Sequence, residues 1–283
     1  MKSRPSGKPE SDDEQRRLAV LIDADNAPPT AIEGLLAEVA KYGVASVKRI
    51  YGDFTSTRMT QWKQALLKHS ISPVQQFAYT SGKNATDSSL IIDAMDLLYT
   101  NRFDGFCLVS SDSDFTRLAQ RLREEGLTVY GFGERKTPDA FVQACDKFIY
   151  TEVLRAQTPA VVPAKPVKSA PVLAKPKAKA KKSTPVAAAE PTAVPVPEPA
   201  GKSEALPLDL IRQAIEEASD DQGWAFLGTM GSYLNKIRPN FDPRLYGHKK
   251  LSDLLKQHPK HFEIQERGGD GGTGKRIYVR IRG

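Results

Sequence analysis

The sequence predicts an α/β domain, with a parallel sheet covered by helices on both faces, followed by a small winged helix-turn-helix domain of α+β type. Two observations lead to this prediction. Over residues 16–156, short apolar runs alternate with segments of helical spacing, a pattern typical of a parallel sheet. Over residues 205–283, three helical segments precede two runs that alternate like strands.

The first domain is expected to contain five strands and four helices. The run Phe106-Cys107-Leu108-Val109, for example, is long enough for a buried strand and too short for a helix. Two prolines, Pro28 and Pro29, fit the start of a helix, because the first turn leaves that N–H without a partner. The expected strands are 18–23, 44–51, 73–78, 106–109 and 127–132, and the expected helices are 28–41, 59–69, 87–99 and 115–125.

The chain has 283 residues, a length that suggests two domains plus connections. Residues 1–15 read as a disordered tail. Residues 157–204 are almost all Pro, Ala, Val and Lys, so we expect a disordered linker that cannot bury a core. The expected domains are therefore 16–156 and 205–283.

The formal net charge is +7, and its distribution is uneven. Residues 1–156 carry 20 Lys and Arg against 21 Asp and Glu, whereas residues 157–204 carry 8 against 3 and residues 205–283 carry 13 against 10. An acidic site tethered to basic segments suits a polyanionic substrate that is held in one place and cut in another. A solubilising role for the basic segments remains the alternative.

Several classes of protein are disfavoured by composition. The only two cysteines, Cys107 and Cys145, lie in apolar runs, which indicates buried thiols rather than a disulfide framework or a metal site. The N-terminal segment is polar and no apolar run is long enough to span a bilayer. These features predict a cytoplasmic protein without a membrane partner.

Two of the expected strands end in acidic sequences. Ligands of open α/β sheets bind at the carboxyl edge, so these side chains should face one crevice. The residues concerned are Asp23, Asp25 and Asn26 after the first strand, and Ser110, Ser111, Asp112 and Asp114 after the fourth.

A third acidic position lies at the start of the helix expected over 87–99. Thr86 is a plausible N-cap, which places Asp87 in the first turn, where the helix dipole favours a carboxylate. Asp87 could serve this dipole alone. Asp93 falls on another face of the same helix, where it either supports the acidic site or is solvated.

Together these carboxylates predict a site for Mg²⁺ or Mn²⁺, since carboxylate oxygens are hard ligands. Carboxylates that converge to about 4 Å repel by about 4 kcal/mol at an effective dielectric of about 20, so a cation or a raised pKa is needed. Phosphodiester hydrolysis is the chemistry that uses such a cluster. The residues expected to hold phosphate oxygens or orient water are Asn26, Lys83, Ser110 and Ser111.

The acidic segments resemble the NYN domain, the LabA-like group of PIN-like nucleases. The resemblance spans about residues 16–155 and rests on segments 21–26, 82–87, 93–98 and 110–115. It implies a Rossmann-like three-layer α/β/α fold and metal-dependent ribonuclease activity. By motif match, the principal metal ligands would be Asp23, Asp87 and Asp112, with Asn26 and Asp114 in support and Asp114 counted among the catalytic residues.

Two alternatives to this enzyme reading are open. One is an RNA-binding adaptor whose NYN domain no longer cuts. The other is a haloacid-dehalogenase-type phosphatase, because Asp23 and Asp25 resemble its nucleophile and acid. That motif usually has Thr or Val two positions after the second Asp, and here Ala27 stands there, followed by two prolines, which counts against it.

The C-terminal segment resembles the OST-type HTH, or LOTUS, domain of RNA-regulating proteins. Helices are expected at 206–218, at 224–237 and from 246 onward, and strands at 262–265 and 276–281. Trp224, Phe226 and Phe262 are expected in the core rather than as platforms on which bases stack. A solvated charged face or a protein partner is the alternative to RNA. The basic residues expected to follow a phosphate backbone are Lys249, Lys250, Lys275 and Arg276.

The sequence therefore predicts a Mg²⁺- or Mn²⁺-dependent endoribonuclease with a tethered RNA-binding domain. The identity of the RNA, the choice between RNA and DNA, the number of metal ions and the oligomeric state are left open by the sequence.

Overall fold

The computed structural model describes residues 15–77, 85–155, 206–268 and 275–282. The first two ranges form one six-stranded sheet with the order β3-β2-β1-β4-β5-β6. Every neighbouring pair of strands is parallel, as predicted. The strands are β1 (Arg17–Asp23), β2 (Val44–Gly52), β3 (Ser72–Gln75), β4 (Gly105–Val109), β5 (Thr128–Gly133) and β6 (Lys147–Tyr150).

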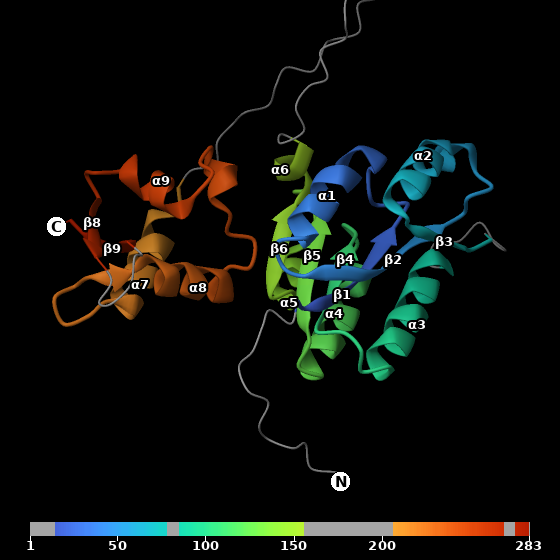
Figure 1. Cartoon of the computed structure of the whole chain (residues 1–283), viewed down its shortest axis with the longest axis horizontal. Coiled ribbons are helices and arrows are strands. Elements are labelled where there is room, and N and C mark those ends of the chain that lie inside the picture. Colours follow the sequence, from blue (N-terminus) through green and yellow to red (C-terminus); the bar gives the residue numbers. More distant parts are fainter. Residues whose placement is uncertain (1–14, 78–84, 156–205, 269–274, 283) are drawn as a thin grey trace, which may run out of the picture. The chain divides into compact units, whose positions relative to one another are not determined.

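Helices cover both faces of this sheet (Figure 1). Helices α1, α2 and α6 pack on one face, and α3, α4 and α5 pack on the other. The three-layer α/β/α fold predicted from the sequence is confirmed. The helices are α1 (Ile32–Val39), α2 (Thr60–His69), α3 (Ala85–Tyr99), α4 (Thr116–Glu124), α5 (Asp139–Ala144) and α6 (Thr151–Arg155).

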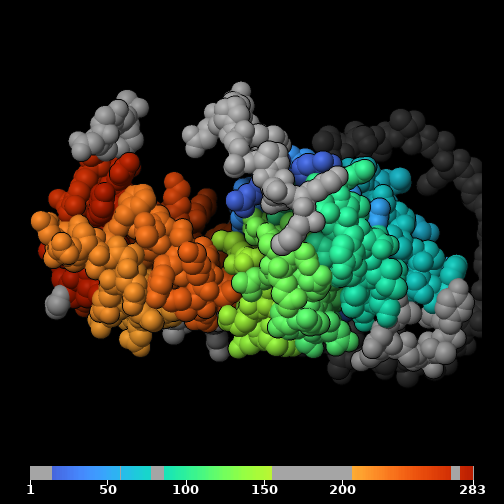
Figure 2. Space-filling view, turned by 90° about the horizontal axis from the view of Figure 1, so that it is seen from below, coloured from blue at the N-terminus to red at the C-terminus, as the bar shows by residue number. Residues whose placement is uncertain are grey.

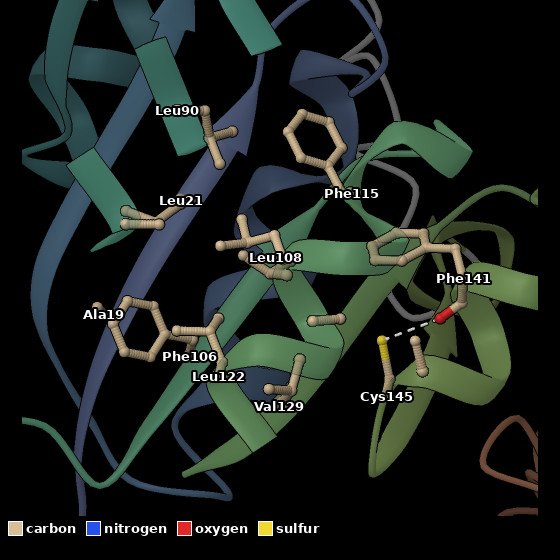
Figure 3. Packing of buried hydrophobic residues seen from close by; sticks show 14 of the residues in the cluster. Ala19, Leu21, Leu90, Phe106, Leu108, Phe115, Leu122, Val129, Phe141 and Cys145 are labelled. Carbon is tan, nitrogen blue, oxygen red and sulfur yellow. Dashed lines mark hydrogen bonds between the residues drawn. The ribbon is translucent and has the colours of Figure 1, made fainter. Parts of the chain in front are cut away.

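The central strands supply the two cores because their side chains alternate between the faces. In β1, Leu21 faces the α3 side and Ile22 faces the α1 side, and both side chains are fully buried. Figure 3 shows part of the α3-side core, in which Leu90 and Phe115 pack with residues of the sheet. Phe115 belongs to the short 3₁₀ helix η3 (Ser113–Phe115), so the core anchors the turn that follows β4.

The strand order reverses between β1 and β4. From β1 the chain builds β2 and β3 on one side, and then returns to build β4, β5 and β6 on the other. Ile22 pairs with Val109 at this boundary, so the residues that follow β1 and β4 emerge side by side. Such a reversal point opens a crevice outside the carboxyl ends of the strands.

Three elements of this domain were not predicted, and one strand is shorter than expected. Helix α5 has six residues, β6 has four and α6 has five, lengths at which periodicity carries little signal. Strand β3 ends at Gln75 rather than residue 78, which lies outside the described residues. Helix α3 begins at Ala85, so Thr86 lies inside the helix instead of capping it.

The C-terminal ranges contain helices and a three-stranded antiparallel sheet of order β7-β9-β8. The core of this domain includes Ile211, Met230 and Leu255, all fully buried. This agrees with the predicted small winged-helix domain. The elements are α7 (Leu208–Ala218), β7 (Ala225–Phe226), α8 (Leu227–Ile237), α9 (Leu251–Lys256), β8 (Phe262–Gly268) and β9 (Lys275–Ile281).

All three helices of this domain begin later than predicted, and α7 begins at Leu208 rather than at residue 206. Trp224 precedes β7 and only 8% of its surface is exposed, so it is a core residue outside α8. Phe226 is 40% exposed, so its predicted place in the core is wrong, because it follows the buried Ala225 in β7 and points to the other face of the sheet. The third helix was expected to start at residue 246, but Gly247 has a left-handed φ of 83° and ends the 3₁₀ helix η4 (Pro243–Tyr246). Helix α9 then begins at Leu251.

Other predictions concern the cysteines and the chain segments between domains. Cys107 and Cys145 are free and buried, as predicted, and Cys145 Sγ donates a hydrogen bond of 3.3 Å to the Phe141 carbonyl (Figure 3). In the described part of the chain, no helix has both the length and the apolar character needed to cross a membrane. The predicted linker 157–204, and residues 1–14 of the predicted tail, lie outside the described residues.

The end of β5 approaches the end of β4 so closely that it requires glycine. A Cβ at Gly133 would lie 2.6 Å from the Ser110 carbonyl oxygen and 2.7 Å from Thr137 Oγ1. We therefore expect Gly133→Ala to lower the free energy of unfolding by about 1–3 kcal/mol, since the backbone beside the crevice must move. Urea unfolding checks this prediction, and we expect a lower midpoint with an unchanged m-value. An unchanged midpoint would contradict the prediction.

Candidate functional site

The carboxylate of Asp23, at the end of β1, is fully buried and held by three donors. Ser110 Oγ donates to Asp23 Oδ2 at 2.8 Å and Asn26 Nδ2 donates to the same oxygen at 2.7 Å. The Asp25 backbone N–H donates to Asp23 Oδ1 at 3.0 Å. Asp23 therefore joins the ends of β1 and β4 at the point where the strand order reverses.

The turn after β4 brings two further carboxylates together. Asp112 is the N-cap of η3, and its Oδ1 accepts the Asp114 backbone N–H at 3.0 Å. Such caps satisfy N–H groups that the helix leaves without partners. Ser110 Oγ also accepts the Asp112 backbone N–H at 3.0 Å, so this hydroxyl links the turn to Asp23.

Asp87 meets this turn from the first turn of α3. Asp87, Asp112 and Asp114 each offer one carboxylate oxygen, and these three oxygens lie within 4.8 Å of one another. We call these three residues the acidic triad. Two of its members are partly buried and Asp114 is exposed, so the triad opens to solvent.

The electrostatics of the triad are unfavourable when no cation is bound. Burial and then the negative charges of Asp23, Asp112 and Asp114 raise the pKa of Asp87 to about 6. Burial also raises the pKa of Asp23, although the hydrogen bonds from Asn26 and Ser110 oppose this rise. Two carboxylates 4.8 Å apart repel by about 3 kcal/mol at an effective dielectric of about 20.

The donor set of the triad fits Mg²⁺ or Mn²⁺. All three ligand atoms are carboxylate oxygens, the hard donors that these ions prefer. Two oxygens on opposite sides of one Mg²⁺ lie about 4.2 Å apart, at about 2.1 Å each from the ion. The separation of up to 4.8 Å is therefore within about an ångström of what one ion requires.

The structure divides the predicted site residues into several groups. Asp114 rather than Asp23 lies in the close group with Asp87 and Asp112, because Asp23 turns its oxygens toward the donors of β1 and β4. Ser111 Oγ accepts the Glu134 backbone N–H at 2.8 Å, so it links the ends of β4 and β5. Lys83 lies outside the described residues.

The predicted basic residues of the C-terminal domain occupy two places. Lys249 and Lys250 are exposed and precede α9, with Lys250 as its N-cap. Lys275 and Arg276 are exposed at the start of β9. These residues therefore lie on a loop and on a strand rather than along one helix.

Asp93 has a structural contact. Its carboxylate accepts hydrogen bonds from the Arg49 guanidinium and the Tyr51 hydroxyl, so it ties α3 to β2. Burial, followed by the hydrogen bond to Asp93, raises the pKa of Tyr51. Asp93 thus holds in place the helix that carries Asp87.

Two cations near the crevice were missed by the sequence analysis. Arg135 and Lys136 are exposed in the loop after β5, next to Glu134, whose backbone contacts Ser111. Lys136 Nζ lies 2.9 Å from a carboxylate oxygen of Glu134. The sequence could have indicated Arg135 and Lys136, because they come just after an expected strand and therefore lie at the same carboxyl edge of the sheet as Asp112.

Comparisons with known families agree with this geometry. Residues 17–153 match the family model of the NYN domain, and residues 203–272 match that of the OST-HTH/LOTUS domain. The chain carries an NYN domain followed by an OST-HTH/LOTUS domain. The NYN domain is a nuclease-type hydrolase family, and its combination with a LOTUS domain places this chain in an RNA-related nuclease family.

Three solved structures resemble parts of the NYN–LOTUS chain. A solution structure from Nitrosomonas europaea, of an uncharacterised protein, is 45% identical over 31% of this chain and 89% of its own, with a TM-score of 0.27. A Chromobacterium violaceum solution structure is 37% identical over 29% and 85%, with a TM-score of 0.23. A Vibrio parahaemolyticus protein of unknown function is 21% identical over 50% and 95%, with a TM-score of 0.42. No curated protein matches significantly.

Proposed function

We propose that the NYN domain is a Mg²⁺- or Mn²⁺-dependent endoribonuclease and that the LOTUS domain holds its RNA. The observation that carries this proposal is the acidic triad, whose three carboxylate oxygens lie within 4.8 Å of one another. In a nuclease-type domain, such a cluster suits phosphodiester hydrolysis. The proposed domains are residues 16–156 and 205–283, joined by a linker over 157–204.

The acidic triad would hold the cation, with Asp23 behind it. A bound divalent ion supplies activation of water and neutralisation of phosphate charge. The Asp112 side chain is oriented for this role because its Oδ1 accepts the Asp114 backbone N–H, a hydrogen bond that fixes the turn. Asp23 adds negative charge close to the triad and holds Ser110 and Asn26 in place through its hydrogen bonds.

The substrate phosphate would be positioned by groups around the crevice. Asn26 Nδ2 donates one of its two protons to Asp23, which leaves the other for a phosphate oxygen. The single proton of Ser110 Oγ is donated to Asp23, so Ser110 would act by holding Asp23 and the turn after β4 in place. Arg135 and Lys136 are exposed at the same edge and carry the positive charge that a phosphate backbone requires. We assign these two residues to the flanking phosphates.

A cleavage assay on the purified full-length chain tests the proposal. Unstructured and folded RNAs are incubated with Mg²⁺ or Mn²⁺, with EDTA, and with metal restored after EDTA. We expect cleavage that EDTA abolishes and metal restores, and no cleavage by an Asp112→Asn variant prepared in parallel. Activity that survives both EDTA and this substitution would identify a contaminant and remove the support for catalysis.

The same assay separates the nuclease from an RNA-binding adaptor. An adaptor would bind RNA with unchanged affinity in the wild type and in Asp112→Asn, and neither protein would cut in any metal. The matching single-stranded DNA in parallel reactions measures the preference for RNA.

A further inference from the structure

The outer face of the three-stranded sheet in the LOTUS domain is basic and aromatic. Along β9, Val279 points into the core and is fully buried, so alternate residues of this strand point outward. The register places Phe226 of β7 and Gln265 of β8 beside Tyr278. The outward residues are Phe226, Glu263, Gln265, Arg267, Arg276, Tyr278 and Arg280.

Rings and guanidinium groups form a continuous line across this face. The Phe226 and Tyr278 rings are 5.8 Å apart between centroids. Arg267 Cζ lies 4.6 Å from the Tyr278 centroid and 5.0 Å from the Trp224 centroid. Arg280 Cζ lies 4.7 Å from the Trp224 centroid on the same line. We call these five residues the stacking line.

The stacking line is held in place, and all of its members except Trp224 are at least partly exposed. Phe226 is 40% exposed, and a Cβ on Gly228 would lie 2.8 Å from its ring, so the ring rests on the Gly228 backbone. Arg280 donates a 2.6 Å hydrogen bond to Glu263. Trp224 is 8% exposed, and its ring lies beneath the guanidinium groups of Arg267 and Arg280. Planar surfaces fixed in this way bind a flat ligand at low entropic cost.

The charges of this face are unbalanced. Arg267 of β8 pairs directly with Arg276 of β9, and like charges directly opposite in a sheet are destabilising. Glu263 is the acidic residue among the outward positions named above. An anionic ligand between Arg267 and Arg276 would relieve this repulsion. Arg276 lies outside the segment that matches the LOTUS family model, which ends at residue 272. In Figure 2, the C-terminal residues, coloured red, lie at the surface.

We propose that the stacking line binds unpaired bases of single-stranded RNA, with Arg276 on the phosphates. This proposal rests on the proposed RNA-binding role of the LOTUS domain and specifies its surface and the form of the RNA. Rings and guanidinium planes stack on base faces, which a duplex hides inside its own stack. A single strand presents those faces together with its phosphates.

The first test removes one ring. Phe226→Ala in the full-length chain, assayed in EDTA so that no cutting occurs, should weaken binding of a labelled unstructured RNA at least about fivefold. Phe226→Tyr keeps a ring and should retain the affinity. Tyr99→Ala is the matched control, because Tyr99 is 64% exposed at the end of α3, and its affinity should not change. Circular dichroism verifies that each variant is folded.

The second test removes one charge. Arg276→Gln should reduce the slope of log affinity against log salt by about 0.7, the value for one phosphate contact with a single strand. Arg102→Gln removes another exposed arginine, which follows α3, and should leave the slope unchanged. A duplex of the same sequence should bind the wild type more weakly than the single strand.

The outcomes separate this proposal from the function on which it rests. If the wild type binds no RNA, the proposed function fails. If it binds RNA while Phe226→Ala and Arg276→Gln are unchanged and Lys249→Gln with Lys250→Gln is weakened, RNA binding stands and this surface is wrong. Equal losses for duplex and single strand in Phe226→Ala would overturn the stacking of unpaired bases. If Phe226→Ala and Arg276→Gln weaken the binding of a protein partner but not the binding of RNA, the proposal would also be overturned.

Discussion

Replacing Asp87 with asparagine should lower the rate of RNA cleavage by about 100-fold or more. The substitution keeps the shape of the side chain but removes one of three carboxylates that lie within 4.8 Å of one another. A divalent ion contributes several kcal/mol to transition-state stabilisation, and about 1.4 kcal/mol corresponds to a factor of ten in rate. Single-turnover cleavage at saturating RNA measures the effect on the chemical step.

The same substitution should stabilise the protein when a chelator is present. Burial and the neighbouring carboxylates raise the pKa of Asp87 from 3.8 to about 6, so between these values the folded state binds more protons than the unfolded state. Stability therefore falls as the pH rises from about 4 to about 6. A shift of this size corresponds to about 3 kcal/mol, which solvent screening at this half-exposed group reduces to about 1 kcal/mol.

Urea unfolding of the wild type and of Asp87→Asn, in EDTA at pH 4 and pH 7, checks this sign. The two proteins should differ little at pH 4, and the variant should be more stable by about 1 kcal/mol at pH 7. Adding Mg²⁺ or Mn²⁺ should stabilise the wild type more than the variant, because an ion that binds only the folded state raises its stability. A variant that is less stable than the wild type at pH 7 in EDTA would refute the electrostatic account of the triad.

The acidic edge of the sheet could be predicted from sequence because each piece of it is local. An apolar run followed at once by Asp23, or by the Ser110 to Asp114 segment, already gives a strand and its carboxyl end. Parallel pairing then brings the two ends together. The parallel α/β fold and the region of its site thus follow from alternation and from residues adjacent in the chain, whereas the NYN family was indicated by the resemblance of the acidic segments.

The division of roles among the carboxylates could not be predicted in the same way. Asp23 and Asp112 both follow strands, but Asp23 is surrounded by donors from Asn26 and Ser110. Asp112 instead turns toward Asp114 through a cap. Which oxygen meets which donor depends on side-chain geometry and on the depth of burial, and the sequence pattern contains neither.

The basic face of the LOTUS domain shows a different limit. The alternation of residues 276–281 predicted a strand, but the partner of each outward residue depends on the register with β7 and β8. Only that register places Arg267 over both Tyr278 and Trp224. Trp224 was correctly expected in the core, yet its role beneath two arginines could not be read from the sequence.

Deleting residues 205–283 should weaken RNA binding at least about tenfold and flatten its dependence on salt. The deletion removes 13 Lys and Arg against 10 Asp and Glu, including the arginines of the sheet face, and each lost phosphate contact lowers the slope by about 0.7. Because the acidic triad remains, the rate at saturating RNA should stay close to that of the full chain while KM rises, the pattern expected when only uniform binding is lost. Fluorescence anisotropy over a salt series in EDTA measures the first effect, and cleavage kinetics with metal measure the second.

Circular dichroism of the truncated protein serves as the control for folding of the NYN domain. Unchanged affinity and slope would show that the LOTUS domain does not hold the RNA, whereas an equal fall in rate at saturation would show that it acts on the chemical step.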